Sequence, residues 1–110
     1  MSYNPTRHLQ EALALTVIQC RQNLDISQEK LAEKTGFSRV YISLLERCKR
    51  KPGLDSVFRL CQGLEITPIE FIKILTANQS NLIAKHQAYD FDIKGHKKAA
   101  DSKQITYFKP

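Results

Sequence analysis

The sequence has few of the residues that would build a disulfide framework, a zinc site or a phosphate-binding loop. It contains only three cysteines and four glycines among 110 residues. The odd cysteine count and the lack of C-x-x-C spacing argue against a disulfide framework and a typical zinc site, so we predict reduced thiols. These thiols belong to Cys20, Cys48 and Cys61.

Histidines are equally sparse. They stand at positions 8, 86 and 96, and neither metal-ligand spacing nor a glycine-rich phosphate loop accompanies them. We interpret them as solvated side chains. The sequence therefore predicts no catalytic residues, no metal and no cofactor, and it argues against an enzyme.

Long apolar runs are also missing. No segment approaches the roughly 20 apolar residues that span a bilayer. The first residues lack the basic segment and short apolar core of a secretory signal. From these absences we expect a cytoplasmic protein with no membrane partner.

What the sequence does contain is positive charge and enough apolar side chains for a core. Lys and Arg number 17 against 11 Asp and Glu, and the formal net charge of +6 favours an anionic partner such as nucleic acid. Hydrophobic residues make up 42% of the chain, more than disordered sequences usually carry. At this length we expect one folded domain over residues 1–78 and a C-terminal extension over residues 79–110.

Apolar periodicity and capping residues predict five helices and an all-α fold. Asn4 and Pro5 fit an N-cap and a first helical residue, while Ser27 and Ser38 are N-cap residues for two short helices. Gly36 ends the earlier of these two, because glycine tolerates the left-handed backbone that closes a helix. The helices are expected over residues 4–22, 27–34, 39–47, 54–63 and from 67 onward.

The start of the fifth helix is the best-marked boundary. Thr67 and Glu70 form a T-x-x-E capping box, with Pro68 at the first helical position. The run that follows is apolar on more than one face, which indicates either simple core packing or a second buried surface against a dimer partner. The residues assigned to this dimer interface are Ile69, Phe71, Ile72 and Leu75.

Beyond Asn78 the helical pattern weakens. Residues 82–88 fit an extension of the helix, residues 89–94 alternate apolar and polar side chains, and residues 104–109 fit a strand. This pattern suggests a terminal β-hairpin. Its strands could pair with a protein partner or cross over a dimer.

The segment Ile26 to Glu46, which reads ISQEKLAEKTGFSRVYISLLE, resembles the helix-turn-helix of the phage-repressor and Cro (XRE) family. The resemblance extends in register from about Leu13 to Leu75, and it implies a five-helix repressor-like DNA-binding domain. The shared features are the pairs Ser27-Gln28 and Leu31-Ala32, Gly36 in the turn, the run Tyr41-Ile42-Ser43, and Glu46-Arg47.

The resemblance implies that the third helix is the recognition helix, which lies in the DNA major groove. Arg39 can donate two hydrogen bonds to guanine, with a phosphate contact as the alternative. Val40 and Leu44 stand where the family often carries polar residues, so they either touch thymine methyl groups or reduce the reading face. The outward-facing residues are expected to be Ser38, Arg39, Val40, Ser43 and Leu44.

Phosphate contacts are expected on both sides of this helix. Gln28 matches the family residue that clamps a phosphate at the start of the second helix. Tyr41 either contacts a phosphate through its hydroxyl or packs against the turn. A basic cluster follows where the family's chain passes along the DNA backbone, and it consists of Arg47, Lys49, Arg50 and Lys51.

Three further residues are assessed through the resemblance. Arg21 and Glu46 match the family's buried ion pair, which fixes how the recognition helix is held. Cys48 stands where the family usually has a glycine with positive φ, so the helix end is either strained or differently closed. The flanking cations also allow a redox switch at this thiol.

These features predict a homodimeric transcriptional regulator that binds double-stranded DNA at an inverted repeat, with half-sites about 34 Å apart. Restriction–modification controller proteins are small members of the family, and this chain is similar to them in its compact core and in the segment Gly63 to Glu65. The alternative is an antitoxin-like protein that uses the same fold and binds a protein partner through its tail.

Overall fold

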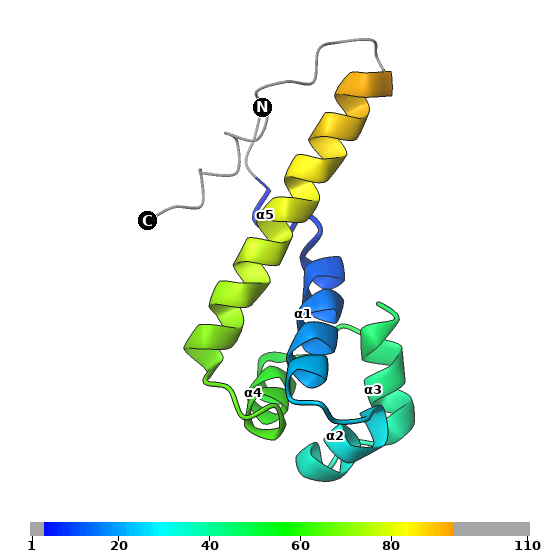
Figure 1. Ribbon diagram of the computed structural model, residues 1–110, viewed down its shortest axis with the longest axis vertical. Coiled ribbons are helices and arrows are strands. Elements are labelled where there is room, and N and C mark those ends of the chain that lie inside the picture. Colours follow the sequence, from blue (N-terminus) through cyan, green and yellow to red (C-terminus); the bar gives the residue numbers. More distant parts are fainter. Residues whose placement is uncertain (1–3, 94–110) are drawn as a thin grey trace.

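The computed structural model describes residues 4–93 of the chain, and within this range the fold consists of five helices without a strand. The predicted all-α architecture is therefore confirmed. α5 is the longest helix, and its C-terminal half extends beyond the four shorter helices (Figure 1). The helices are α1 (Leu9–Asn23), α2 (Gln28–Thr35), α3 (Arg39–Glu46), α4 (Leu54–Gly63) and α5 (Pro68–Ile93).

The two short helices α2 and α3 begin and end where their capping residues predict. The hydroxyl of Ser27 accepts a hydrogen bond from the Lys30 N–H at 3.0 Å, and the hydroxyl of Ser38 accepts one from the Tyr41 N–H at 3.0 Å. These bonds satisfy amide groups that a helix start leaves without partners. Gly36 closes α2 with a φ of 81°, so the chain turns within three residues into α3.

The predicted start of the first helix is wrong. Residues 5–8 form turns, and α1 begins at Leu9 because His8 has a left-handed backbone with a φ of 56°. Asn4 does cap this segment, since its side-chain oxygen accepts a hydrogen bond from the Thr6 N–H at 3.1 Å. The left-handed residue interrupts the helical backbone that Asn4 and Pro5 were expected to start.

The core lies where α1 and α5 meet the three shorter helices. Phe71 of α5 is fully buried, and Leu75 is 8% exposed, so both pack inside one chain. Their assignment to a dimer interface is wrong, because an amphipathic helix buries its apolar stripe against its own domain first. Other buried residues from all five helices include Val17, Leu31, Ile42, Leu60 and Cys61.

Buried polar side chains of α5 bind α1 and the segment that precedes it. Asn78 Nδ2 donates to the hydroxyl of Thr16 and to the side-chain oxygen of Gln19, both at 2.9 Å. Gln79 Nε2 donates to the carbonyl oxygens of Pro5 at 2.8 Å and Arg7 at 2.9 Å. Buried amides need such partners, so these contacts set the register of α5 along α1.

α5 also continues further than its sequence pattern predicts. It crosses position 78, where the domain boundary was placed, without a break and runs to Ile93. The strand expected over residues 89–94 is therefore wrong for the part that the structure describes. Adding residues to an existing helix needs no new nucleation, and a short alternation of apolar residues does not outweigh this advantage. The second expected strand, residues 104–109, lies outside the described residues.

Candidate nucleic-acid interface

α3 has a buried face that anchors it and an outer face that is open to solvent. Ile42 and Leu45 are 0% and 2% exposed and hold α3 against the core. Val40 is 63% exposed, and Arg39 is exposed beside it at the start of the helix. Ser38, Ser43 and Leu44 complete this outer face, the last two half-buried. The helix can therefore contact a groove with one side while the opposite side stays packed.

An ion pair with little solvent exposure ties the C-terminal end of α3 to α1. Arg21 Nε donates to Glu46 Oε2 at 2.6 Å, and Arg21 Nη2 donates to Glu46 Oε1 at 3.0 Å. The Arg21 and Glu46 side chains are only 15% and 5% exposed. The hydrogen bond to Glu46 raises the pKa of Arg21 above its ordinary value, although burial acts in the opposite direction. This two-bond geometry fixes both the position and the angle of α3.

The same ion pair is connected to α2. Gln28 Nε2 donates to Glu46 Oε1 at 2.9 Å, and Arg21 Nη1 donates to the carbonyl oxygen of Ile26 at 2.8 Å. Gln28 is half-buried, at the first residue of α2. One carboxylate thus receives hydrogen bonds from α1 and α2, and the three helices are held together at the end of the outer face.

The basic segment, residues 47–51, leaves α3 along the protein surface. Its four cationic residues are all exposed, whereas Cys48 is half-buried and has a φ of 61°. The positive φ expected at this position is therefore confirmed. Gln10 of α1 donates from Nε2 to the carbonyl oxygens of Cys48 and Arg50, each at 3.3 Å. The path of the basic segment is thus set by α1, which leaves its cations free to contact an anion.

Arg59 of α4 is a residue of this region that the sequence analysis did not single out. Its Nη2 donates to the carbonyl oxygen of Thr35 at 2.8 Å, and its guanidinium carbon lies 4.3 Å from the centre of the Phe37 ring. Phe37 in turn packs against Tyr41, with ring centres 4.8 Å apart. Arg59 therefore stabilises the turn between α2 and α3 through contacts made from α4. Only the proximity of α4 to this turn reveals the role.

Exposed apolar side chains lie at the beginnings of α4 and α5. Ile69 and Ile72, two of the four residues assigned to a dimer interface, are 73% and 43% exposed. Phe58 and Leu54 of α4 are 54% and 71% exposed, and neither was predicted for this role. The i, i+4 spacing of Leu54 and Phe58 would have shown that they share one face of α4. These four residues have no core function in the single chain.

The geometry defines a helix-turn-helix domain, in which a short outward-facing helix is held by a second helix across a tight turn. A family model described as "Helix-turn-helix" matches residues 17–71. The chain therefore belongs to the helix-turn-helix family.

Comparison with individual proteins agrees with this membership. The chain is 33% identical over 52 residues to an uncharacterized HTH-type transcriptional regulator, y4dJ, of Sinorhizobium fredii. The match covers 47% of this chain and 68% of that relative. Within residues 4–93, no helix is both long and apolar enough to cross a membrane.

Among solved structures the fold is similar to that of the restriction–modification controller protein C.Esp1396I. In the structure of its tetramer in complex with its natural 35 base-pair operator, one chain superposes on this chain with a TM-score of 0.63 at 28% identity. The match covers 64% of this chain and 93% of that one. The same protein bound to a 19 base-pair duplex gives a TM-score of 0.62 over the same shares of the two chains.

Proposed function

We propose that this protein is a transcriptional regulator that binds double-stranded DNA at a specific sequence as a homodimer. The observation that carries the proposal is the outer face of α3, which is open to solvent while its inner face and its C-terminal end are fixed. A rigidly held helix that can fit the major groove is the basic requirement for reading base edges. The structures of the similar protein C.Esp1396I in complex with DNA support this function.

Arg39 is the proposed base-reading residue. It is exposed at the first residue of α3, where side chains of a recognition helix contact base edges. Its two-pronged donor geometry matches the O6 and N7 acceptors of guanine, a contact that discriminates by about 1–3 kcal/mol. Val40, beside it, offers an apolar contact to a thymine methyl group.

The basic segment and Gln28 are the proposed phosphate contacts. The cations of residues 47–51 are exposed, and each phosphate they neutralise would contribute about −0.9 to the slope of log affinity against log salt. The amide nitrogen of Gln28 carries two hydrogens, so it can keep its bond to Glu46 and donate the second to a phosphate. The positive end of the α2 dipole favours an anion at this place.

The proposed dimer interface comprises the exposed apolar residues of α4 and α5. Ile69 and Ile72 are predicted from the sequence and are exposed, and Phe58 joins them because it is large, apolar and more than half exposed. Covering these side chains would remove apolar surface from water, which is a main driving force for association. A two-fold dimer would place two α3 helices on successive turns of DNA, at an inverted repeat.

The protein acts as a DNA-binding regulator rather than as an enzyme, and it does so in the cytoplasm, together with the DNA it binds. The division into residues 1–78 and 79–110 stays a prediction. The alternative in which the tail binds a protein partner also stays a prediction, since residues 94–110 lie outside the described range.

The experiment that tests this function is selection of binding sites from a random duplex pool by the full-length protein at physiological salt. We expect enrichment of an inverted repeat. Arg39→Ala should relax the preference at one position of each half-site, whereas Lys85→Ala, at an exposed lysine in the C-terminal half of α5, should leave the selected sequence unchanged. Weak, salt-sensitive binding without enrichment would refute sequence-specific recognition.

A further inference from the structure

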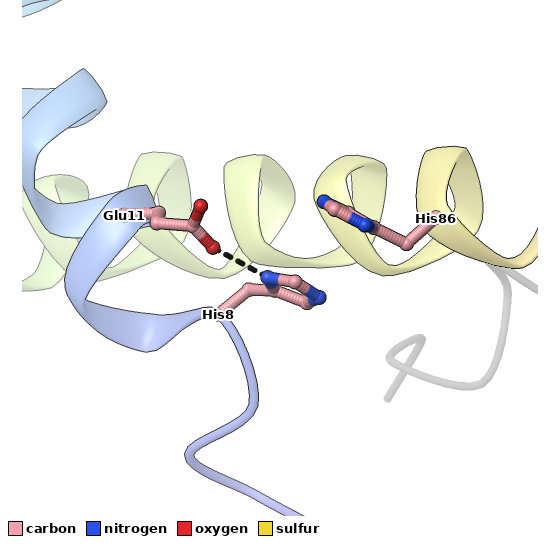
Figure 2. A group of neighbouring side chains, drawn as sticks. All are labelled: His8, Glu11 and His86. Atoms are coloured by element: carbon pink, nitrogen blue, oxygen red, sulfur yellow. Dashed lines mark hydrogen bonds and ion pairs between the residues drawn. The ribbon is translucent and has the colours of Figure 1, made fainter. Parts of the chain in front are cut away.

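Two histidines and a glutamate, which lie up to 78 positions apart in the sequence, meet at the side of the molecule where α1 begins. His8 and Glu11 come from the start of α1, and His86 comes from the C-terminal half of α5 (Figure 2). His8 Nδ1 lies 2.5 Å from Glu11 Oε1, and the two imidazole rings are stacked with centres 4.2 Å apart. None of these contacts serves the outer face of α3.

The local structure turns these side chains toward one another. His8 is placed by its left-handed backbone, a conformation that costs energy for a residue with a side chain. Gln79 stands seven positions before His86 and therefore lies on the same face of α5. Its Nε2 donates hydrogen bonds to the carbonyl oxygens of Pro5 and Arg7. The segment that carries His8 is thus fastened to the face of α5 that carries His86.

The donor atoms match the preferences of a transition metal. Imidazole nitrogens and a carboxylate oxygen are ligands for Zn²⁺ and its neighbours, and the three donor atoms all lie within 4.8 Å of one another. Ligands of a tetrahedral zinc ion are about 3.4 Å apart at bond lengths of about 2.1 Å. Glu11 and His86 are exposed, so rotation of their side chains can adjust the separations between donor atoms to this value.

We propose that His8, Glu11 and His86 form a binding site for one divalent transition-metal ion, with zinc as the test ion. Three protein ligands leave a fourth position for water. Glu11 and His86 are exposed, so an ion can reach the three side chains directly from solvent. The bound ion would fasten the start of α1 to the extended half of α5.

The test is calorimetric titration of the full-length protein, without an affinity tag, with Zn²⁺ at pH 7.5 after removal of metal by a chelator. We expect one ion per chain. His86→Ala and Glu11→Gln should each weaken binding at least tenfold, because even loss of an outer partner of a metal ligand costs about 10–100-fold. His8→Asn removes the ligand while keeping a residue that tolerates a positive φ.

Two controls separate this site from unspecific binding. Lys85→Ala changes the exposed neighbour of His86, and His96→Ala removes a histidine that lies outside the described residues and is not one of the three proposed ligands. Both should bind zinc like the unchanged protein. Zinc should also raise the melting temperature of the unchanged protein and not that of His86→Ala. Failure to bind one ion per chain, or an equal loss in His96→Ala, would overturn the proposal.

Discussion

Arg21 Nε lies 2.6 Å from Glu46 Oε2, so that α1 binds the last residue of α3, the helix proposed to read DNA. Both side chains are largely buried, and Gln28 adds a third donor to the same carboxylate. The pair fixes the orientation of α3 relative to α1. Removing one partner would leave the other charge buried and unpaired, which lowers the free energy of unfolding.

Arg21→Ala should lower the free energy of unfolding by about 3–5 kcal/mol, because it leaves the Glu46 carboxylate buried without its main partner. Urea denaturation monitored by circular dichroism measures this loss. Lys30→Ala is the matched control, since Lys30 Nζ lies 3.6 Å from Glu33 Oε1 in an ion pair that is more than half exposed. Surface pairs contribute about 0–1 kcal/mol. Equal losses in the two variants would contradict the role given to the buried pair.

Gly63→Ala should destabilise the domain by about 1–2 kcal/mol, although alanine is the better helix former. A Cβ atom on Gly63 would lie 2.5 Å from Thr35 Cγ2 and 3.2 Å from Leu31 Cδ1. Both side chains are buried and cannot move aside. Gly53→Ser is the control, because a Cβ atom there has no neighbour within 4 Å and serine is a good N-cap for α4. A melting temperature for Gly63→Ala at or above that of the unchanged protein would show that α2 and α4 can separate.

Stability should fall as the pH rises from about 9 to about 11. Burial raises the pKa of the Cys61 thiol from 9.0 to about 11, with a further contribution from Cys20. The folded chain therefore keeps a proton that the unfolded chain releases above pH 9, and the free energy of unfolding declines until the folded thiol also ionises. The contribution is about 2–3 kcal/mol at 1.36 kcal/mol per pKa unit.

Denaturation curves at pH 8 and pH 11 for the unchanged protein and Cys61→Ala measure this effect. The variant loses stability at both values through its cavity, but its decline between them should be smaller. Lysines and tyrosines titrate in both proteins and cancel in the comparison. Parallel declines would mean that the Cys61 thiol does not govern the alkaline transition.

Arg59→Ala should destabilise the turn between α2 and α3, because it removes the hydrogen bond to the Thr35 carbonyl and the cation over the Phe37 ring. We expect a loss of about 1–2 kcal/mol in urea denaturation. Arg59→Lys should recover only part of it, since an ammonium group cannot reproduce the planar stacking. If Arg59→Lys restores full stability, the positive charge alone stabilises the turn, and the planar contacts of the guanidinium group do not contribute.

Much of the fold could be predicted because its signals are local. Ser27, Ser38 and Gly36 act within one turn of their own positions, and their capping roles follow from chemistry that needs no distant partner. The buried residues of α3, Ile42 and Leu45, follow from helical spacing alone. The residues of α3 that lie opposite this buried face form its outer face, so they could be predicted from the same spacing.

Other assignments failed because they depend on contacts between distant segments. Phe71 and Leu75 belong to an apolar run that fits two buried surfaces, and only packing against the rest of the chain places them in the core. His8 has a left-handed backbone at the end of the turn segment and so delays α1; Gln79 of α5 donates to two carbonyl oxygens of that segment. Neither outcome has a signal at its own position in the sequence.

The sequence by itself determined five helices, the tight turn between α2 and α3, the face that α3 presents, and the membership of the helix-turn-helix family. The tertiary structure alone decided the length and buried face of α5, the stabilising contacts of Arg59, and the meeting of His8, Glu11 and His86. The physical reason is range: capping bonds and helical periodicity act over three or four residues. Packing and buried hydrogen bonds join residues more than 60 positions apart, such as Asn78 and Thr16, which only the folded chain brings together.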